Sequence, residues 1–414
     1  MPEYLTPDRF HDLLRNASEV YAPGCAGHSA VFERWLREAP ECSDGVRYTG
    51  IHIPTVNRFD FAGLHPRARM RNLFLGTDWR AAWTRGAFDY LPISYSAAWQ
   101  WLSAHAHFDI ALVQVAPPDA DGHCSLGIAA DFTPAAWPNA RRVIAHVNPA
   151  MPRTQGGSIP WSRLDAVVEH DAPLLEAPDP AADPVLDRVA AHVAALIPDR
   201  ACVQLGLGKL QSAVLRKLRD HRGLRIHSGM VSDGLLELLD SDALDPSADA
   251  VTAGVALGTR ALYAAVPGRV RFRDVGHTHD AGVLRAIPRL HAINSALSVD
   301  LFGQVNGDVL GGRFVSGLGG LPDFLRGARQ APGGRGIVAL ASVTGDDRSR
   351  IVPRLDPGPA SLPRIDADHV VTEFGVADLR YLDTHARARA LIEIAAPAHR
   401  EALAQAWFEI AARL

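Results

Sequence analysis

A strand, a tight turn and the start of a helix follow one another in Cys202-Val-Gln-Leu-Gly-Leu-Gly-Lys-Leu210. Glycines in such a turn allow positive φ and let the backbone approach a ligand closely. The N-terminus of the following helix offers free N–H groups to an anion. The turn matches neither the dinucleotide fingerprint, because Gln211 stands at the third glycine position, nor the P-loop, because Leu210 follows Lys209. A ligand-binding turn and a plain strand-to-helix connection both fit these residues.

The rest of the 414-residue chain also alternates short apolar runs with helical patterns. We predict buried strands at residues 111–115, 143–147, 203–205 and 337–341, and helices at 210–218 and 386–395. Such alternation indicates open, mainly parallel sheets. A segment rich in proline and small residues, 171–184, is typical of a linker. The sequence therefore predicts an α/β protein of two domains, residues 1–178 and 185–414, with a site in the cleft between them.

Composition and charge narrow the class of protein. Hydrophobic residues make up 47% of the chain, charged residues 21%, and the net charge is -4 without a long charge run. This balance indicates a globular protein and argues against nucleic-acid or membrane-surface partners. The opening residues MPEYLTPDRF lack the pattern of a signal peptide, and no run of apolar residues is long enough for a membrane span. We expect a cytoplasmic protein whose four scattered cysteines are free thiols.

A second informative stretch, Arg225-Ile-His-Ser-Gly-Met-Val-Ser-Asp-Gly234, follows the glycine turn. Together the two stretches resemble the acetyl-CoA hydrolase/transferase family, which includes acetate and 4-hydroxybutyrate CoA-transferases. Further segments carry the same resemblance in the same order along the chain: 113–127, 147–158, 293–304, 316–324 and 371–379. Each segment is modest alone, but their joint order across most of the chain is specific.

The resemblance implies a fold, a substrate and a set of contacts. The fold would be two similar open-sheet α/β domains of the CoA-transferase type, assembled as a homodimer or higher homo-oligomer. Coenzyme A or an acyl-CoA would be the substrate, an unidentified small molecule the acceptor, and no metal would take part. The residues that would contact CoA lie in the two glycine loops and in a nearby basic position: Gly206, Leu207, Gly208, Lys209, Leu210, Gly317, Gly319, Gly320 and Arg335.

One departure from the family pattern concerns the reaction itself. In the family, a glutamate follows His-Ser/Thr and attacks the acyl-CoA thioester, whereas this chain has Gly229 at that position. Glycine has no side chain and cannot be a nucleophile. Ser298 and Leu321 replace a family glutamate and glutamine in two other motifs, and Lys209 replaces a residue that is commonly small. Because these departures gather in the active-site motifs, we predict a changed reaction.

Histidines are the candidate general bases, since their unperturbed pKa is about 6.5. His227 lies two residues before Gly229, but the family shares it, so a structural role also fits. His277 and His279 form a His-x-His pair without the further ligands that a metal site needs, and His28 lies in an N-terminal glycine-containing turn. The remaining carboxylate nearby, Glu237, fits a solvated helix position better than a substitute nucleophile.

Direct attack on the thioester is the chemistry that these residues leave possible. Backbone N–H groups of the glycine loops could stabilise an oxyanion, and a general base could activate the acceptor. We therefore predict direct acyl transfer from an acyl-CoA to an alcohol or amine, or hydrolysis of the acyl-CoA. The alternatives are CoA transfer between carboxylates, decarboxylation of an acyl-CoA, and a binding protein without catalytic activity.

Overall fold

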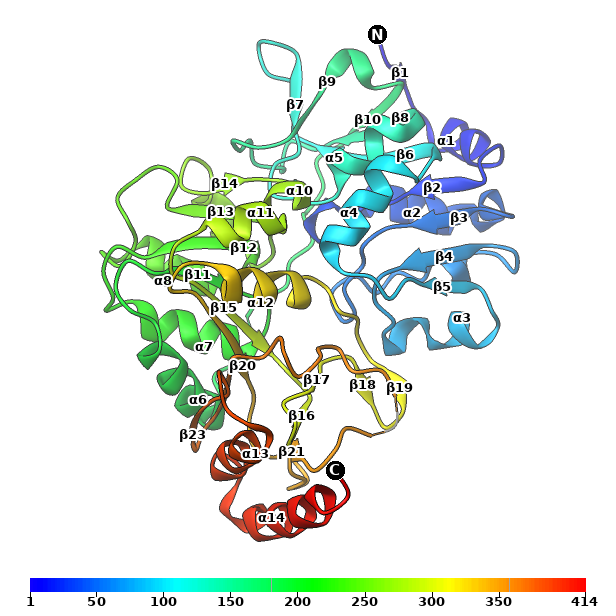
Figure 1. Ribbon diagram of the computed structural model, residues 1–414. Coiled ribbons are helices and arrows are strands. Elements are labelled where there is room, and N and C mark those ends of the chain that lie inside the picture. The colour runs from blue at the N-terminus through cyan, green and yellow to red at the C-terminus, as the bar shows by residue number, and fades with distance from the viewer. Residues whose placement is uncertain (180, 357) are drawn as a thin grey trace. The chain divides into compact units, whose positions relative to one another are not determined.

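The computed structural model describes residues 1–179, 181–356 and 358–414 (Figure 1). The chain forms two compact units, and each unit draws on separate stretches of the sequence. The first consists of Met1–Pro178, Val251–Thr278 and Val315–Gly319. The second consists of Asp179–Ala250, His279–Phe314 and Gly320–Leu414.

The first unit is built on an eight-stranded sheet whose order is β1-β10-β8-β6-β2-β3-β4-β5. All of its neighbouring strands are parallel. The strands are β1 (Glu3–Tyr4), β2 (Glu19–Tyr21), β3 (Arg47–Thr49), β4 (Arg69–Asn72), β5 (Phe88–Tyr90), β6 (Phe108–Val115), β8 (Ala140–Val147) and β10 (Ala166–Glu169). The predicted strands 111–115 and 143–147 are the buried parts of β6 and β8, as expected of central strands in a parallel sheet.

Helices and short ribbons complete the first unit. The helices are α1 (Pro7–Leu14), α2 (Ala30–Glu38), α3 (Arg80–Thr84), α4 (Tyr95–Ala104), α5 (Thr133–Ala136), α9 (Arg260–Ala265) and α10 (Val275–Thr278). Hydroxyl side chains cap three of them, because Thr6, Ser29 and Ser94 each accept a hydrogen bond from a backbone N–H in the first turn. Two short strand pairs are β7 (His123–Ser125) with β9 (Ser158–Pro160), and β13 (Val251–Ala256) with β14 (Arg271–Phe272).

The second unit has strands in the order β12-β11-β15-β20-β22-β23. They are β12 (Arg225–Val231), β11 (Cys202–Leu205), β15 (Leu290–Ser295), β20 (Arg335–Ala339), β22 (His369–Thr372) and β23 (Gly375–Asp378). These neighbours are parallel except for the hairpin of β22 and β23. A smaller part adds β16 (Ser298–Asp300), β17 (Val305–Asn306), β18 (Val309–Leu310), β19 (Arg313–Phe314) and β21 (Ile351–Val352).

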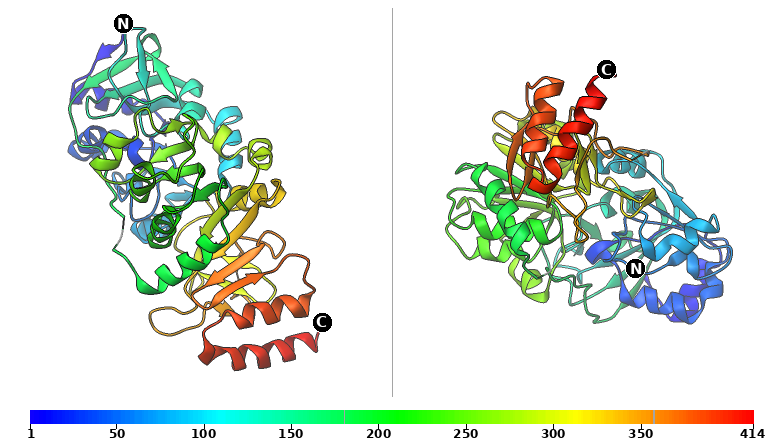
Figure 2. Two further views of the ribbon diagram at one scale, coloured as in Figure 1. Left: turned by 90° about the vertical axis from the view of Figure 1, so that its left-hand side faces the viewer. Right: turned by 90° about the horizontal axis from the view of Figure 1, so that it is seen from below.

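The helices of the second unit are α6 (Pro184–Ala195), α7 (Lys209–Leu218), α8 (Gly234–Leu239), α11 (Ala281–Ala286), α12 (Leu321–Gln330), α13 (Thr384–Glu393) and α14 (Pro397–Ala411). Helices α6 and α7 pack side by side, and so do α13 and α14 near the C-terminus (Figure 2). The predicted helix 386–395 begins two residues earlier, because the Asp383 carboxylate caps α13 by accepting from the Ala386 N–H.

Helix α12 is the element of this unit that matters most for the site. It packs against β15 and β20 through Phe324, Leu325 and Ala328, whose exposed fractions are 2%, 0% and 0%. The α/β class with parallel sheets is thus confirmed. Among the described residues, no helix is both long enough and apolar enough to span a membrane.

Candidate active site

The carboxyl ends of neighbouring strands in the second unit bring the glycine turn and Gly229 together. Strand β11 ends at Leu205, which pairs with Ile293 of β15, so the turn begins level with Asn294. On the other side, the Ser228 Oγ of β12 donates to the Leu205 carbonyl at 2.7 Å, which places Gly229 beside the turn. Ligands of open α/β sheets bind at such strand ends.

The turn requires glycine at one position and leaves space at another. Gly208 has φ +127°, a backbone conformation that residues with a side chain rarely adopt. Helix α7 follows it, and no side chain caps the N-terminus of that helix. A Cβ atom at Gly206 would meet nothing closer than 3.7 Å. The backbone at the start of α7 can therefore approach an anionic or carbonyl oxygen of a ligand.

Hydrogen bonds between amide and hydroxyl side chains connect this turn to the neighbouring strand β15. Gln211 Nε2 donates to Ser295 Oγ at 2.8 Å, and Asn294 Nδ2 donates to Gln204 Oε1 at 3.0 Å. Gln211 and Gln204 are almost fully buried. These four residues were not predicted from the sequence, although Gln211 is the residue that breaks the dinucleotide fingerprint. Its amide fixes the turn through β15.

The imidazole of His279 occupies the space beside Gly229. A Cβ atom built on Gly229 would lie 2.6 Å from His279 Cε1 and 3.0 Å from Nε2. A Cβ on Gly320, at the start of α12, would also collide with the ring, and Phe324 packs on it with ring centroids 4.5 Å apart. The ring therefore fits only because residues 229 and 320 are glycines. A side chain from another part of the chain therefore fills the space beside residue 229.

Burial keeps this imidazole neutral. His279 is 2% exposed, and burial lowers its pKa to about 3, with a smaller effect in the same direction from His227. His227 and Gly229 lie two residues apart on β12 and face the same side of the strand. His227 is itself 6% exposed. The structure thus brings together His227, Gly229, His279 and Gly320, beside the turn of Gly206–Leu210.

The candidate site residues that belong to the first unit each contact other residues of that unit. His28 Nε2 is 2.7 Å from Glu33 Oε2, an interaction that lowers the pKa of Glu33 to about 2. The His277 N–H donates to Asp274 Oδ1 at 3.1 Å. Gly317 and Gly319 approach residues 73 and 74 of the same unit. The His-x-His pair is divided, since His277 belongs to the first unit and His279 to the second.

Four further candidates of the second unit also have clear positions. Arg335 is the first residue of β20 and pairs with His291, so it lies at the amino end of the strands, away from Gly206. Lys209 opens α7 and is exposed, whereas Leu210 is buried in the core. Glu237 is exposed on α8, as expected for a solvated helix position. Over the described residues, no cluster of three or more histidine, cysteine or acidic side chains could hold a metal ion.

Buried neutral histidines predict acid lability of the fold. Burial lowers the pKa of His52 and His279 to about 3, and of His146 and His369 to about 4. In the unfolded chain these histidines bind protons below about pH 6.5, whereas in the folded protein they stay neutral. The free energy of unfolding therefore decreases as the pH is lowered below about 6.5. Going from pH 6.5 to 5.5 should cost about 1 kcal/mol per histidine. Asp131, whose pKa burial raises to about 6, offsets a part. Urea unfolding at both pH values measures the loss, and equal midpoints would contradict this account.

Comparisons with known proteins identify the family of this chain. The acetyl-CoA hydrolase/transferase N-terminal domain matches residues 47–176, and the C-terminal domain of the same family matches residues 258–407. The 4-hydroxybutyrate coenzyme A transferase of Clostridium kluyveri is 37% identical over 366 residues, which are 85% of this chain and 85% of that protein. A succinyl-CoA:acetate/propanoyl-CoA:succinate CoA transferase of Fasciola hepatica is 34% identical over 97% of this chain and 87% of its own length.

A solved structure extends the similarity to the whole fold. The crystal structure of RipA from Yersinia pestis superimposes with a TM-score of 0.91 at 29% identity, covering 99% of this chain and 97% of that one. Acetyl-CoA hydrolases, such as that of Neurospora crassa at 24% identity over 73% of this chain and 66% of its own length, are also among the relatives. The chain therefore belongs to the acetyl-CoA hydrolase/transferase family and is an enzyme of that family.

Proposed function

We propose that this protein cleaves an acyl-CoA thioester by direct attack of an acceptor or of water, without a glutamyl-CoA intermediate. The observation that carries the proposal is the position of His279, whose imidazole lies where a side chain of residue 229 would begin. The glycine turn at 206–210 would hold the thioester end of the acyl-CoA. The products are free CoA and either an acylated alcohol or amine, or the free acid.

His279 would polarise the thioester carbonyl. A histidine whose pKa is lowered to about 3 stays neutral at physiological pH, and protonation in its buried position is unfavourable. Such an imidazole is a poor proton acceptor but can donate a hydrogen bond from its N–H to a developing oxyanion, as neutral histidine electrophiles do. Backbone N–H groups at the start of α7 would supply further donors.

His227 would act as the general base. It faces the same side of β12 as Gly229 and lies close enough to His279 to affect its pKa. In the proposed step, His227 takes the proton of the attacking hydroxyl, amine or water while the new bond to the acyl carbon forms. The carbon–sulfur bond then breaks, and the same proton goes to the leaving CoA thiolate. No oxidant, metal or carboxylate nucleophile is needed.

CoA transfer between carboxylates is the second candidate, because several relatives are named as CoA-transferases. That reaction proceeds through a carboxylate nucleophile. Gly229 supplies none, and Glu237, the nearest glutamate along the chain, is exposed on α8. The family relationship thus favours CoA transfer, while the geometry around residue 229 favours direct attack.

Mass spectrometry of the protein mixed with a panel of acyl-CoAs and labelled acetate separates the two candidates. We expect free CoA to appear, slowly with water and faster once a suitable alcohol or amine is supplied, with no label in acetyl-CoA. Protein masses should show no CoA adduct. Labelled acetyl-CoA would overturn the proposal in favour of CoA transfer.

A further inference from the structure

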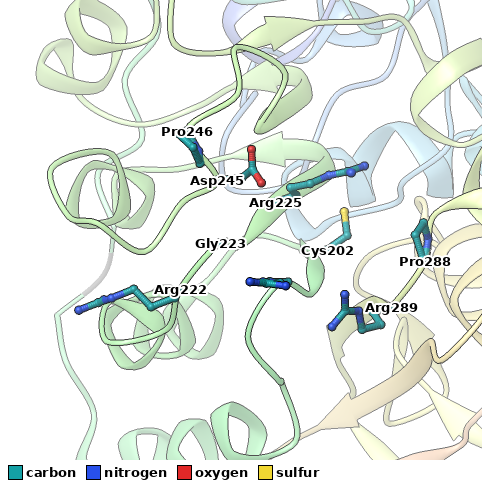
Figure 3. Close-up of a pocket in the computed structure, with 9 residues that line it drawn as sticks. Cys202, Arg222, Gly223, Arg225, Asp245, Pro246, Pro288 and Arg289 are labelled. Carbon is teal, nitrogen blue, oxygen red and sulfur yellow. The ribbon is translucent and has the colours of Figure 1, made fainter.

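An arginine-rich cavity lies at the amino ends of the strands of the second unit (Figure 3). Its volume is about 580 Å³, which lies within the range of small-molecule sites. The residues that line it come from the starts of β11 and β12, from the segments that precede β11, β12 and β15, and from the segment between α8 and β13: Arg200, Cys202, Arg222, Gly223, Arg225, Asp245, Pro246, Pro288 and Arg289. None of them belongs to the candidate active site.

The charge of the cavity is strongly positive. Four arginines and one aspartate line the cavity, which gives it a formal charge of +3. The pKa of Asp245 is lowered by hydrogen bonds from Ser247, so this carboxylate is already engaged by its own loop. Across the part of the chain that the structure describes, none of the four guanidinium groups makes a salt bridge. The cavity therefore holds more cationic groups than anionic partners, although the nearby charge of Arg225 also contributes to the lowered pKa of Asp245.

The backbone holds two of these arginines in place at a conformational cost. Arg200 has φ +60° and Arg289 has φ +54°, values that are uncommon for residues with a side chain. The Arg200 N–H donates to the Arg222 carbonyl at 2.8 Å, and the Arg289 carbonyl accepts from the Cys202 N–H at 3.0 Å. Gly223 completes this arrangement, because a Cβ there would lie 3.1 Å from Arg200 Cγ. The arginines are thus fixed at their Cα atoms although their ends reach solvent.

The cavity and the candidate active site occupy opposite ends of the same strands. Arg225 opens β12, whereas Gly229 lies four residues further along it, about 13 Å at the rise of an extended strand. Cys202 opens β11, and Gly206 follows its last residue. A ligand in the cavity would therefore be separate from the thioester.

We propose that this cavity binds a small anion that carries two or more phosphoryl groups. Guanidinium groups match phosphoryl oxygens with paired N–H donors and keep their charge at all physiological pH values. Several arginines around one cavity favour a diphosphate over a single carboxylate. Figure 3 shows Arg225 and Arg289 on either side of Cys202, whereas the side chain of Arg222 extends away from them. Arg225 and Arg289 are thus the principal ligands, and Arg222 offers a matched control.

Isothermal titration of the intact protein with pyrophosphate and with ADP, at constant ionic strength, tests the proposal. We expect saturable binding of at least one probe. The double variant Arg225→Gln/Arg289→Gln should weaken it by about tenfold or more, because it removes two guanidinium groups that donate paired, charge-assisted hydrogen bonds to phosphoryl oxygens. Arg222→Gln removes one charge from the same loop and should leave the affinity within about twofold, as expected for an exposed charge at the rim.

A second control separates this cavity from the glycine turn, where a diphosphate could also bind. Lys209→Gln alters that turn and should not change the titration. Tighter binding of ADP than of pyrophosphate would assign the cavity to a phosphorylated organic ligand, and the reverse would assign it to inorganic diphosphate. The proposal is overturned if neither probe binds, or if the double variant, with an unchanged unfolding midpoint, binds as well as the wild type. Loss of binding in Lys209→Gln alone would equally overturn it.

Discussion

Replacing His279 with alanine is expected to lower kcat for acyl-CoA cleavage by about 10²–10³-fold, the usual loss when an oxyanion donor is removed. The affinity for acyl-CoA should change little, because the glycine turn at 206–210 stays intact. Stopped assays of free CoA under single-turnover and steady-state conditions measure the effect. His279→Gln, which keeps an N–H donor of similar reach, should retain more activity than His279→Ala.

The control for this experiment is His277→Ala. His277 lies two residues away in the sequence but belongs to the other compact unit. If His279 acts by its position beside Gly229, removal of His277 should leave kcat within a factor of about three, as expected for a residue without a part in the chemistry. Equal losses in both variants would instead indicate that the His-x-His segment matters only for structure.

The substitution Gly229→Glu is expected to inactivate the enzyme and to destabilise it by about 1–3 kcal/mol, as overpacking of a well-filled site does. Its Cβ would lie 2.6 Å from His279 Cε1, so the ring must move. The ring cannot move cheaply, because Gly320 and Phe324 enclose it. Urea unfolding and the free-CoA assay measure the two effects. A variant as stable and as active as the wild type would show that the ring is not confined there.

The double variant Gly229→Glu/His279→Ala removes that conflict. Taking away the imidazole opens the space in which the side chain of the new glutamate begins. We expect the unfolding midpoint to recover relative to Gly229→Glu and labelled acetate to appear in acetyl-CoA, which the wild type should not produce. Recovery of stability without exchange would locate the remaining obstacle in other departures, such as Ser298 and Leu321.

Much of the second unit could be predicted from local patterns. Asp183 caps the N-terminus of α6 and Pro184 is the first residue of that helix. The glycine turn after β11 leads directly into α7. These features depend on residues close in sequence, so propensity and periodicity suffice to find them. The hydrogen bond from Gln211 to Ser295 could not be found in this way, because it joins residues that only the pairing of β11 with β15 brings together.

The sequence by itself determined the α/β class, the glycine turn and the absence of a carboxylate at residue 229. Only the tertiary structure decided which side chain lies beside that glycine. The candidates His227, His277, His279 and His28 were equivalent by side-chain chemistry. His279 is distinguished by the contacts it makes with Gly229, Gly320 and Phe324, which lie about 40–50 residues away on either side. Packing of α12 on β15 and β20 brings these segments together, and such long-range packing leaves no local periodicity in the sequence.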